Sequence, residues 1–388
     1  MTIKISNRIA HSPPLATTAM HARADALRRA GKPVIDLSIA ISHFAAPEPV
    51  AAAVEAAVAR REAMPYADVI GEPAVRAALA DKLRRENGVE AGVDEIIVTN
   101  GAKQAYYQAL YALTDPGDTI AVFRPYWPAY LATARLLGLN VVLADLPDTL
   151  NEAALDALGP LRVLVINNPH NPSGKVYGRA ELELLRDWSA RRGVCVICDE
   201  SYEHLVFEGR HLSLAALGGW RDPGVVTLFS ASQSYAMMGW RVGFALAPAP
   251  LVQAMQSLQG PVTAAVPHLS QVAAQAAFGS GAPHALLRDY RARRDAVVAR
   301  CAALPWMRLP APPAGPYLWA DVRRLTHDTL AFAESLLEQA LVAVMPGEAL
   351  GLHGHIRLGY IQDDAATLME GIERIAAFGD GCAVRAVS

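Results

Sequence analysis

The stretch Arg162–Gly174, with the sequence RVLVINNPHNPSG, joins an apolar run to a sharp loop. Its first part, RVLVIN at 162–167, is rich in Val, Leu and Ile with little polar alternation, which predicts a strand covered on both faces. Its second part, Asn168–Gly174, contains two Asn-Pro steps and a glycine, all turn-forming residues. Because α/β folds bind ligands outside the carboxyl ends of their strands, this loop is a candidate binding loop, although a plain turn has the same composition.

Similar apolar runs occur along the middle of the chain, and helix-like segments separate them. Helices are expected from about Ala102 and after Pro128. Alternating strands and helices are typical of an α/β fold with a mostly parallel central sheet sandwiched by helices. The other apolar runs are EIIVT at 95–99, TIAVF at 119–123, NVVLA at 140–144, VCVICD at 194–199, VVTLFS at 225–230 and RVGFALA at 241–247.

The pattern changes from about Pro283, where the sequence predicts a smaller α+β lobe. Helical and strand-like segments are mixed there, and no internal repeat or long flexible linker is visible. The expected elements are a helix at about 284–303, a strand at 317–322, a helix near 328–339, a short strand near 342–345, a strand at 355–360 and a last helix near 363–378.

Composition argues against several classes of function. The chain has 388 residues, of which 52% are hydrophobic and 19% charged, with a formal net charge of −3, so a large core is expected and a basic nucleic-acid or membrane surface is not. No apolar run reaches the roughly 18 residues that a membrane span needs. The N-terminus lacks the apolar core of a signal peptide, so a cytoplasmic location is expected.

Cys195 and Cys198 form a C-x-x-C pair. A redox or zinc site would need a second ligand pair or a helix N-terminus next to these cysteines, and neither is visible. The pair lies inside the apolar run VCVICD, so we expect core residues and no metal site.

Asp199 ends that same run. A carboxylate at the end of a buried strand is unfavourable unless it is paired, and a cationic pyridinium nitrogen is such a partner. Tyr202 follows three residues later, where its phenol could reach an oxygen on the same ring. The alternative is a helix-capping aspartate followed by a core tyrosine.

The segment Ser230–Gly243 reads SASQSYAMMGWRVG. Small hydroxyl side chains together with Arg241 suit a phosphate monoester, because serine supplies neutral donors and arginine a bidentate cation. A serine-rich loop with a structural arginine explains the segment equally well.

Taken in order and at these separations, the three segments resemble the class I/II aminotransferases, a family of fold-type I enzymes that use pyridoxal 5′-phosphate (PLP). The resemblance extends from about residue 33 to 376 and is far more specific than any single motif. We therefore expect an N-terminal segment, 1–45, that joins the small domain, a large PLP-binding domain, 46–280, and a small C-terminal domain, 281–388. Further matching positions are Ser38-Ile39, Phe44, Tyr66, Gly71, Pro73, Asn100–Gln104, Pro125–Pro128 and Ile356–Leu358.

The resemblance assigns roles to individual residues. Asp199 would pair with the protonated pyridine nitrogen and, with Tyr202, belong to the catalytic set. Asn171 and Tyr202 would contact the ring oxygen, and Trp127 would stack on the ring. The residues implied for the phosphate are Gly101, Ala102 and Lys103 at a helix N-terminus, together with Ser230, Ser232, Arg241 and Tyr66.

The resemblance also implies substrate and partner contacts. Arg357 would hold the α-carboxylate of an amino-acid substrate with its guanidinium fork, and Ala40, Asn171 and Trp127 would line the substrate side. Tyr66 would reach the phosphate of a neighbouring subunit, which implies a homodimer with a shared active site.

One position departs from the family pattern. The family places its Schiff-base lysine eight residues before the arginine that corresponds to Arg241, and this sequence has Gln233 there. An amide is neither a useful nucleophile nor a useful base, so we expect an inactive or impaired chain that holds an external aldimine. Either Gln233 is an engineered replacement made to trap a complex, which the intact cofactor residues favour, or the chain belongs to a natural lysine-free branch.

The segment Ala40–His43 is a second departure, because relatives usually have Gly-x-Pro-x there. Ala40 removes backbone freedom and narrows the substrate side, and His43 is either a substrate contact or exposed. Three functions therefore stay open. They are transamination of an α-amino acid, a PLP-dependent elimination, cyclisation or carbon–carbon bond formation (for example on S-adenosylmethionine), and PLP binding without catalysis.

Overall fold

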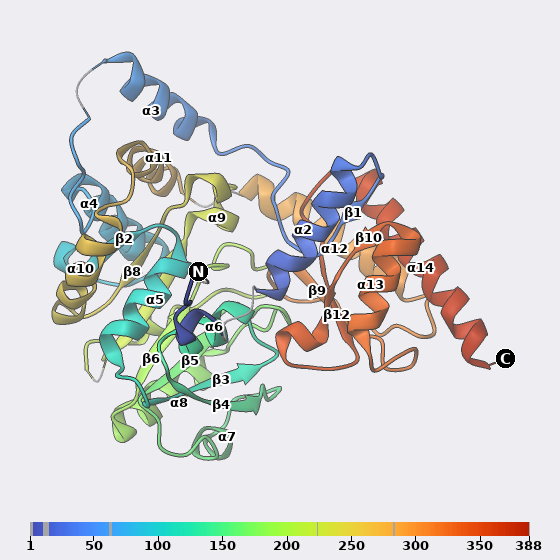
Figure 1. Ribbon diagram of the computed structural model, residues 1–388. Helices are drawn as coiled ribbons and strands as arrows, with labels where there is room; N and C mark the ends of the chain where they lie inside the picture. The colour runs from blue at the N-terminus through green and yellow to red at the C-terminus, as the bar shows by residue number, and fades with distance from the viewer. Residues whose placement is uncertain (1–2, 11–14, 62–63, 223, 282–283, 388) are drawn as a thin grey trace.

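The computed structural model describes residues 3–10, 15–61, 64–222, 224–281 and 284–387, which form two lobes (Figure 1). We call the elements from α3 to α11 the large lobe, and α2, β1 and the elements from α12 onward the small lobe. The helices of the large lobe are α3 (Glu48–Ala59), α4 (Pro73–Lys82), α5 (Ala102–Leu113), α6 (Pro128–Leu136), α7 (Glu152–Asp156), α8 (Arg179–Arg192), α9 (Ala231–Ser234), α10 (Ala249–Thr263) and α11 (His268–Gly279).

A seven-stranded sheet of order β2-β8-β7-β6-β5-β3-β4 forms the centre of the large lobe. β8 is antiparallel to its neighbours β2 and β7, and the other pairs are parallel, which confirms the mostly parallel sheet expected from the alternating pattern. The strands are β2 (Ile96–Thr99), β3 (Thr119–Arg124), β4 (Asn140–Asp145), β5 (Val163–Asn167), β6 (Cys195–Asp199), β7 (Val225–Ser230) and β8 (Gly243–Leu246).

Most of these strands are buried on both faces, as their apolar sequences predict. β4 differs: it is an edge strand whose residues are exposed or half-buried, so the expectation of two covered faces is wrong there. Cys198 is buried and Cys195 half-buried, neither cysteine is in a disulfide, and no group of metal-ligating side chains occurs among the described residues. These positions agree with a core role for the C-x-x-C pair.

The small lobe combines both ends of the chain. In Figure 1 the blue α2 and β1 lie among the orange and red C-terminal elements, and Ile35 of β1 pairs with Val342 of β10. The elements of this lobe are α2 (Ala16–Arg29), β1 (Ile35–Asp36), α12 (His284–Cys301), β9 (Tyr317–Asp321), α13 (Thr329–Ala340), β10 (Val342–Ala343), β11 (Met345–Pro346), β12 (His355–Gly359) and α14 (Ala365–Val387).

Two local expectations for the small lobe need correction. The single short strand expected near 342–345 is two strands, because β10 pairs with β1 whereas β11 pairs with β12. The last helix continues to Val387, beyond the expected end near 378. α1 (Asn7–Ala10) precedes both lobes in the chain. The short helical turns within the lobes are η1 (Leu83–Asn87), η2 (Val93–Glu95), η3 (Leu214–Leu217), η4 (Met238–Trp240) and η5 (Gly347–Leu350).

Each lobe has its own apolar core. Two clusters lie in the large lobe, and a third contains Met20 to Ala40 together with Leu286 to Ala376. The large-lobe chain contributes Leu205 and Phe207 to this third cluster, so the lobes also pack against each other. Among the helices described, none combines the length and apolar character needed to cross a membrane.

Candidate active site

A cavity opens where several strand ends of the large lobe meet. β5, β6 and β7 end at this edge, and the antiparallel β8 begins there, with Ser230 opposite Gly243. The cavity is lined by Ala102, Lys103, Trp127, Tyr130, Asn167, Asn171, Asp199, Ser201, Tyr202, Ser230, Ser232, Gln233, Met238, Arg241 and Tyr317.

Asp199 lies on one side of the cavity with 5% of its surface exposed. Its Oδ1 accepts hydrogen bonds from the Ser201 backbone N–H and hydroxyl, at 3.1 and 2.6 Å, and its Oδ2 accepts one from the Tyr130 hydroxyl at 2.7 Å. Burial raises the pKa of Asp199, although the bonds from Ser201 and Tyr130 oppose this effect. No described cationic side chain forms an ion pair with it, so the carboxylate is available to a cationic ligand.

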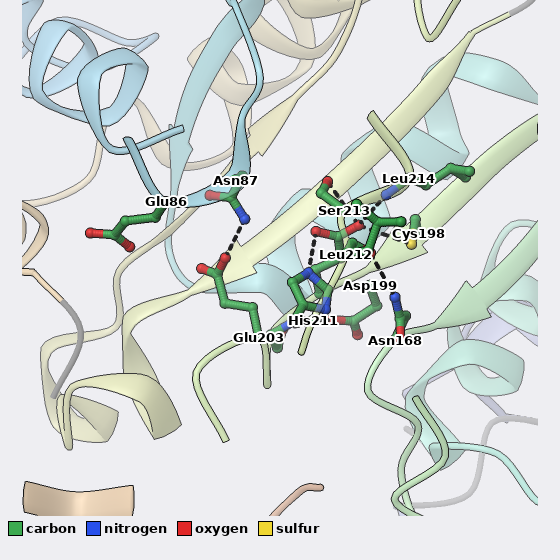
Figure 2. Close-up of polar contacts among 12 residues, drawn as sticks. Glu86, Asn87, Asn168, Cys198, Asp199, Glu203, His211, Leu212, Ser213 and Leu214 are labelled. Carbon is green, nitrogen blue, oxygen red and sulfur yellow. Dashed lines mark hydrogen bonds and ion pairs between the residues drawn. The ribbon is translucent and has the colours of Figure 1, made fainter. Parts of the chain in front are cut away.

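A second buried carboxylate fixes the backbone beyond Asp199. Glu200 accepts hydrogen bonds from the Ser213 hydroxyl and the Leu214 N–H, both at 3.0 Å, and His211 Nε2 lies 2.9 Å from its other oxygen. Figure 2 shows His211, Ser213 and Leu214, which belong to one segment, on the side of the strand end that carries Asp199. These hydrogen bonds to Glu200 hold the backbone at the end of β6 and so fix the direction in which the Asp199 side chain points.

Asn171 links the loop after β5 to the other side of the cavity. The Asn171 N–H donates to Asn167 Oδ1 at 2.7 Å, and its side-chain amide donates to the Tyr202 hydroxyl at 3.4 Å. Burial raises the pKa of Tyr202 well above its usual value, so at neutral pH the phenol is protonated and can donate to an anionic oxygen. The loop Asn168–Gly174 thus places the Asn171 amide beside the Tyr202 phenol.

Arg357 of β12 reaches this pair of residues from the small lobe. It is 1% exposed, its Nη1 donates to Asn171 Oδ1 at 3.2 Å, and its Nη2 donates to the Ser38 carbonyl at 2.9 Å. Its guanidinium lies 3.9 Å from the centre of the Tyr317 ring, and its Nε has no hydrogen-bond partner among the described residues. A buried arginine with a free donor and no paired carboxylate is a candidate anion site.

The opposite end of the cavity concentrates donors for an anion. The helix α5 begins there, after Gly101, so its first N–H groups have no helical partner. Arg241 Nη1 lies 3.4 Å from the Ser232 hydroxyl, and no described carboxylate pairs with Arg241 or with Lys103. Burial is the main cause that lowers the pKa of Lys103, and the nearby positive charge of Arg241 lowers it further.

Gln233 lies on α9 between these two ends. Its Nε2 donates to the Ala40 carbonyl at 3.0 Å, which links the large lobe to the N-terminal segment of the small lobe. Its Oε1 is buried and has no hydrogen-bond partner among the described residues. Lys103 is the lysine among the lining residues, and Lys175 instead pairs with Glu181 at 2.8 Å.

The structure brings most of the residues singled out from the sequence to this cavity, but not all. Gly101 caps α5 directly behind Arg241, and the 4%-exposed Ala40 contacts the site through its carbonyl alone. Tyr66 is 97% exposed and lies outside the cavity. His43 does not line this cavity; the residue is exposed, as one of the two alternatives drawn from the sequence expected, and its ring contacts the Ile361 carbonyl and Arg293.

Several lining residues were missed from the sequence. Tyr130 follows Trp127 by three residues, a spacing that places both side chains on one face of α6. The sequence could therefore have predicted that Tyr130 lies near the cavity. Ser201 follows Asp199 by two residues and could have been read as its hydrogen-bond donor. Tyr317 and Asn167 gave no local signal, since each reaches the cavity through the packing of other elements.

The residues present fit a phosphorylated pyridine. A buried carboxylate without a cationic partner suits a protonated ring nitrogen, and an uncompensated cluster of donors at a helix N-terminus suits a phosphate group. A Cβ added at Gly101 would lie 2.6 Å from Arg241 Nη2, so the guanidinium would have to shift to make room for it. The residues that line the cavity therefore fit PLP.

Comparisons with known proteins agree with this geometry. The family model described as aminotransferase class I and II matches residues 32–375. The aspartate/prephenate aminotransferase of Thermus thermophilus is 35% identical over 385 residues, which cover 96% of this chain and 98% of that protein. The arginine–pyruvate transaminase of Pseudomonas aeruginosa is 34% identical over 368 residues, 92% of this chain and 93% of that protein.

Solved structures give the same result. The aspartate aminotransferase of Thermus thermophilus with maleate superposes with a TM-score of 0.90 at 33% identity, covering 97% of this chain and all of that one. The aspartate aminotransferase of Rhizobium meliloti also gives a TM-score of 0.90 at 33% identity and covers 98% of this chain and 99% of that one. The chain therefore belongs to the class I and II aminotransferase family, whose cofactor is PLP.

Proposed function

We propose that this chain binds PLP without a covalent anchor, together with an α-amino acid, and that transamination is impaired. The observation that carries this proposal is the position of Gln233 in a cavity that otherwise keeps the donors and the carboxylate expected for the cofactor. An amide is neutral and cannot take up a proton from the substrate. Loss of a general base lowers a rate by roughly 10²–10⁴-fold.

Different residues of the chain would bind different parts of the cofactor and of the substrate. When bound, the cofactor supplies an electron-withdrawing ring that weakens bonds at the amino-acid carbon. Asp199 would hold the ring nitrogen in its protonated form, and Arg241 with the α5 N-terminus would hold the phosphate. Arg357 would bind the α-carboxylate through its unpaired Nε, with Tyr317 behind it excluding water.

A second candidate reaction is an elimination, cyclisation or carbon–carbon bond formation on the same cofactor. The departure at Ala40 favours it, because this residue stands where the family usually has glycine and its carbonyl is already engaged by Gln233. Binding of the cofactor without any turnover is the third possibility. All three share the binding residues described above.

We also propose a homodimer in which Tyr66 enters the partner's site. Tyr66 is 97% exposed, which is unusual for an aromatic side chain. A groove between α5 and α10, lined in part by Tyr107, Leu258 and Val262, opens next to Arg241 and gives a second copy an apolar surface to cover. The pairing of Ile35 with Val342 supports the proposed domain division into 1–45, 46–280 and 281–388.

The Gln233→Lys variant tests the proposed function. After incubation with PLP and reduction with borohydride, intact-mass measurement should detect one reduced cofactor on this variant and none on the unchanged chain. Gln253→Lys, at an exposed position of α10, controls for nonspecific labelling of a new lysine. A single adduct on the unchanged chain, at Lys103 for example, would contradict the proposal.

The same variant separates the candidate reactions. If Gln233→Lys exchanges amino groups between amino acids and 2-oxo acids, transamination is the parent reaction. If it consumes the amino acid but releases other products, the second candidate holds. If it forms the adduct but transforms none of a broad panel of amines, the chain is a binding protein.

A further inference from the structure

We propose that Gln233 holds the two lobes together beside the cavity, so that this residue controls how often the lobes separate. The two places where the sequence departs from the family pattern meet here, because the Gln233 side chain donates to the Ala40 carbonyl. The inference concerns contacts within the chain itself and goes beyond the proposed function, which concerns the ligands of the cavity.

The bond between Gln233 and Ala40 requires a donor at position 233. The Ala40 carbonyl can only accept a hydrogen bond, and Gln233 Nε2 supplies the donor at 3.0 Å. Ala40 is 4% exposed, so water competes little for this bond. A leucine at position 233 would have no donor, and an ionised glutamate would have only acceptors.

Ala40 lies in the segment Leu37–Phe44, whose backbone is bonded to strands of the small lobe. The Leu37 N–H donates to the Ala343 carbonyl at 2.8 Å, and the Leu37 carbonyl accepts from the Gly359 N–H at 2.7 Å. Ala343 belongs to β10 and Gly359 to β12. The start of the segment is therefore fixed to the small lobe.

The end of the same segment is attached to the small lobe as well. The Ser42 hydroxyl lies 2.5 Å from the Tyr290 hydroxyl, which donates to it, and the His43 N–H donates to the Ile361 carbonyl at 3.1 Å. His43 Nε2 lies 3.1 Å from Arg293 Nη2. Because Tyr290 and Arg293 belong to α12, we expect the segment to move with the small lobe, so a bond from the large lobe to this segment links the two lobes.

Separation of the lobes would change the cavity. Tyr317 of the small lobe lines it together with large-lobe residues that include Trp127 and Asp199. Part of the cavity wall would therefore move away when the lobes separate, and a ligand without a covalent attachment could leave. The bond from Gln233 to Ala40 would slow this loss.

The reactivity of a thiol at position 40 tests the inference in the cofactor-free chain. Ala40→Cys keeps the backbone carbonyl, and its thiol should react with N-ethylmaleimide only when the lobes separate, since Ala40 is buried. Adding Gln233→Leu should make this reaction about fivefold faster, the equivalent of one neutral hydrogen bond. Gln233→Glu, which is close to glutamine in size but has no side-chain donor at neutral pH, should accelerate it at least as much. Peptide mass spectrometry distinguishes this thiol from the four native cysteines.

Gln253→Leu is the matched control, because it makes the same change at an exposed position of α10. Added to Ala40→Cys, it should leave the reaction rate unchanged. Equal rates with Gln, Leu and Glu at position 233 would overturn the inference, and so would an equal acceleration by Gln253→Leu. If Gln233→Leu does not fold, the comparison of Gln with Glu at position 233 decides.

The consequence for the cofactor rests on the proposed function. Bound PLP should leave the Gln233→Leu chain about fivefold faster than the unchanged chain, measured by the recovery of tryptophan fluorescence after dilution. Equal release rates would overturn this consequence, whereas the thiol reaction would still decide whether the bond holds the lobes. If PLP does not bind to the unchanged chain, the proposed function fails, and the thiol reaction tests the inference by itself.

Discussion

At Asp199, neighbouring side chains decide the charge of a buried carboxyl group. Burial raises its pKa, whereas the hydrogen bonds from Ser201 and Tyr130 favour the ionised form. Only the ionised form attracts a cationic ring nitrogen. Tyr130, which the sequence analysis did not single out, thus stabilises the ionised form of Asp199, which it did. Its contribution can be measured as a change in the pH at which cofactor binding is lost.

We predict that Tyr130→Phe shifts the acid limb of cofactor binding to higher pH. Without the Tyr130 donor the pKa of Asp199 rises further, so the carboxylate is protonated, and binding is lost, at a higher pH as the solution is acidified. At neutral pH the affinity should fall by roughly tenfold, the value of one hydrogen bond to a charged group. Fluorescence titration across a pH series measures both effects.

The control is Tyr111→Phe, which removes a phenol from the half-exposed face of α5. Its pH profile should overlay that of the unchanged chain. If the pH profile of Tyr130→Phe also matched those of the unchanged chain and of Tyr111→Phe, Tyr130 would not control the ionisation of Asp199.

We predict that Gly101→Ala weakens cofactor binding through Arg241. Gly101 has φ +80°, and an added Cβ would lie 2.6 Å from Arg241 Nη2, so the guanidinium would have to move. The phosphate should lose a charge-assisted bond, which lowers affinity by about tenfold. Gly117→Ala is the matched control, because Gly117 also has a positive φ, +98°, but nothing lies within 4 Å of its added Cβ.

Both glycine variants should lose about 1–2 kcal/mol of unfolding free energy, because an L-residue is strained in this conformation. Only Gly101→Ala should lose affinity for the cofactor. Equal losses of affinity in both variants would mean that backbone strain, and not the displaced arginine, is responsible.

At the scale of elements, a buried ion pair ties α4 to the segment that follows β6. Lys82, the last residue of α4, is fully buried and pairs with Glu203, which also accepts a hydrogen bond from Asn87 at 2.6 Å. Figure 2 shows the bond from Asn87 to Glu203. Burial alone would raise the pKa of Glu203, but the charges of Lys82, His204 and His211 outweigh it and lower the pKa to about 2.

We predict that Glu203→Gln lowers the unfolding free energy by up to about 3–5 kcal/mol, because it removes the closer of the two carboxylates that pair with the buried Lys82 ammonium and leaves only Glu86, 3.7 Å away. The sign of the pH effect follows from the lowered pKa. The ion pair contributes its full stability at pH values above 4.5, the ordinary pKa of a glutamate. This stability is lost as the pH falls from 4.5 to about 2, the lowered pKa of Glu203. Denaturant unfolding at several pH values should show this loss in the unchanged chain and not in Glu203→Gln.

Glu183→Gln is the control for this pair. Glu183 forms an exposed ion pair with Arg179 on α8, so its removal should cost about 0–1 kcal/mol. If Glu203→Gln were no more destabilising than Glu183→Gln, the link between α4 and β6 would be energetically unimportant.

For the whole molecule, the site depends on contacts between parts of the chain that are far apart in sequence. Arg357 of the small lobe donates to Asn171 of the large lobe, and Gln233 of the large lobe donates to Ala40 of the N-terminal segment. The cavity is consequently assembled from both lobes, and in the proposed homodimer the partner would supply Tyr66 as well.

We predict that the chain is a dimer in solution and that Val262→Asp weakens the dimer. Val262 is 60% exposed and lines the groove between α5 and α10, so a buried carboxylate there would oppose association. Sedimentation at decreasing protein concentration should show monomer for this variant at concentrations where the unchanged chain is dimeric. Val93→Asp, at a 45%-exposed site outside the groove, should sediment like the unchanged chain. A monomer at every concentration would contradict the proposed dimer.

Those parts of the fold and site that depend on local chemistry could be predicted from the sequence. The apolar runs placed the strands of the central sheet because a fully covered strand has few alternatives. Asp199 stood out because a carboxylate at the end of a buried strand is unfavourable unless it is paired, and Arg241 because it follows a serine-rich loop that suits a phosphate. Sequence patterns did not predict which strands pair with each other when the partners are far apart in the chain. Nothing in the run at 342–345 reveals that β10 pairs with β1 whereas β11 pairs with β12.

The sequence by itself therefore determined the α/β class, the family resemblance and the identity of residue 233. Only the tertiary structure decided that Gln233 donates to Ala40 and leaves its oxygen buried, that Tyr130 donates to Asp199, and that Tyr317 lies against Arg357. The physical reason is that propensity and periodicity act over a few neighbouring residues. A hydrogen bond or a ring contact between distant segments depends on how the whole chain packs.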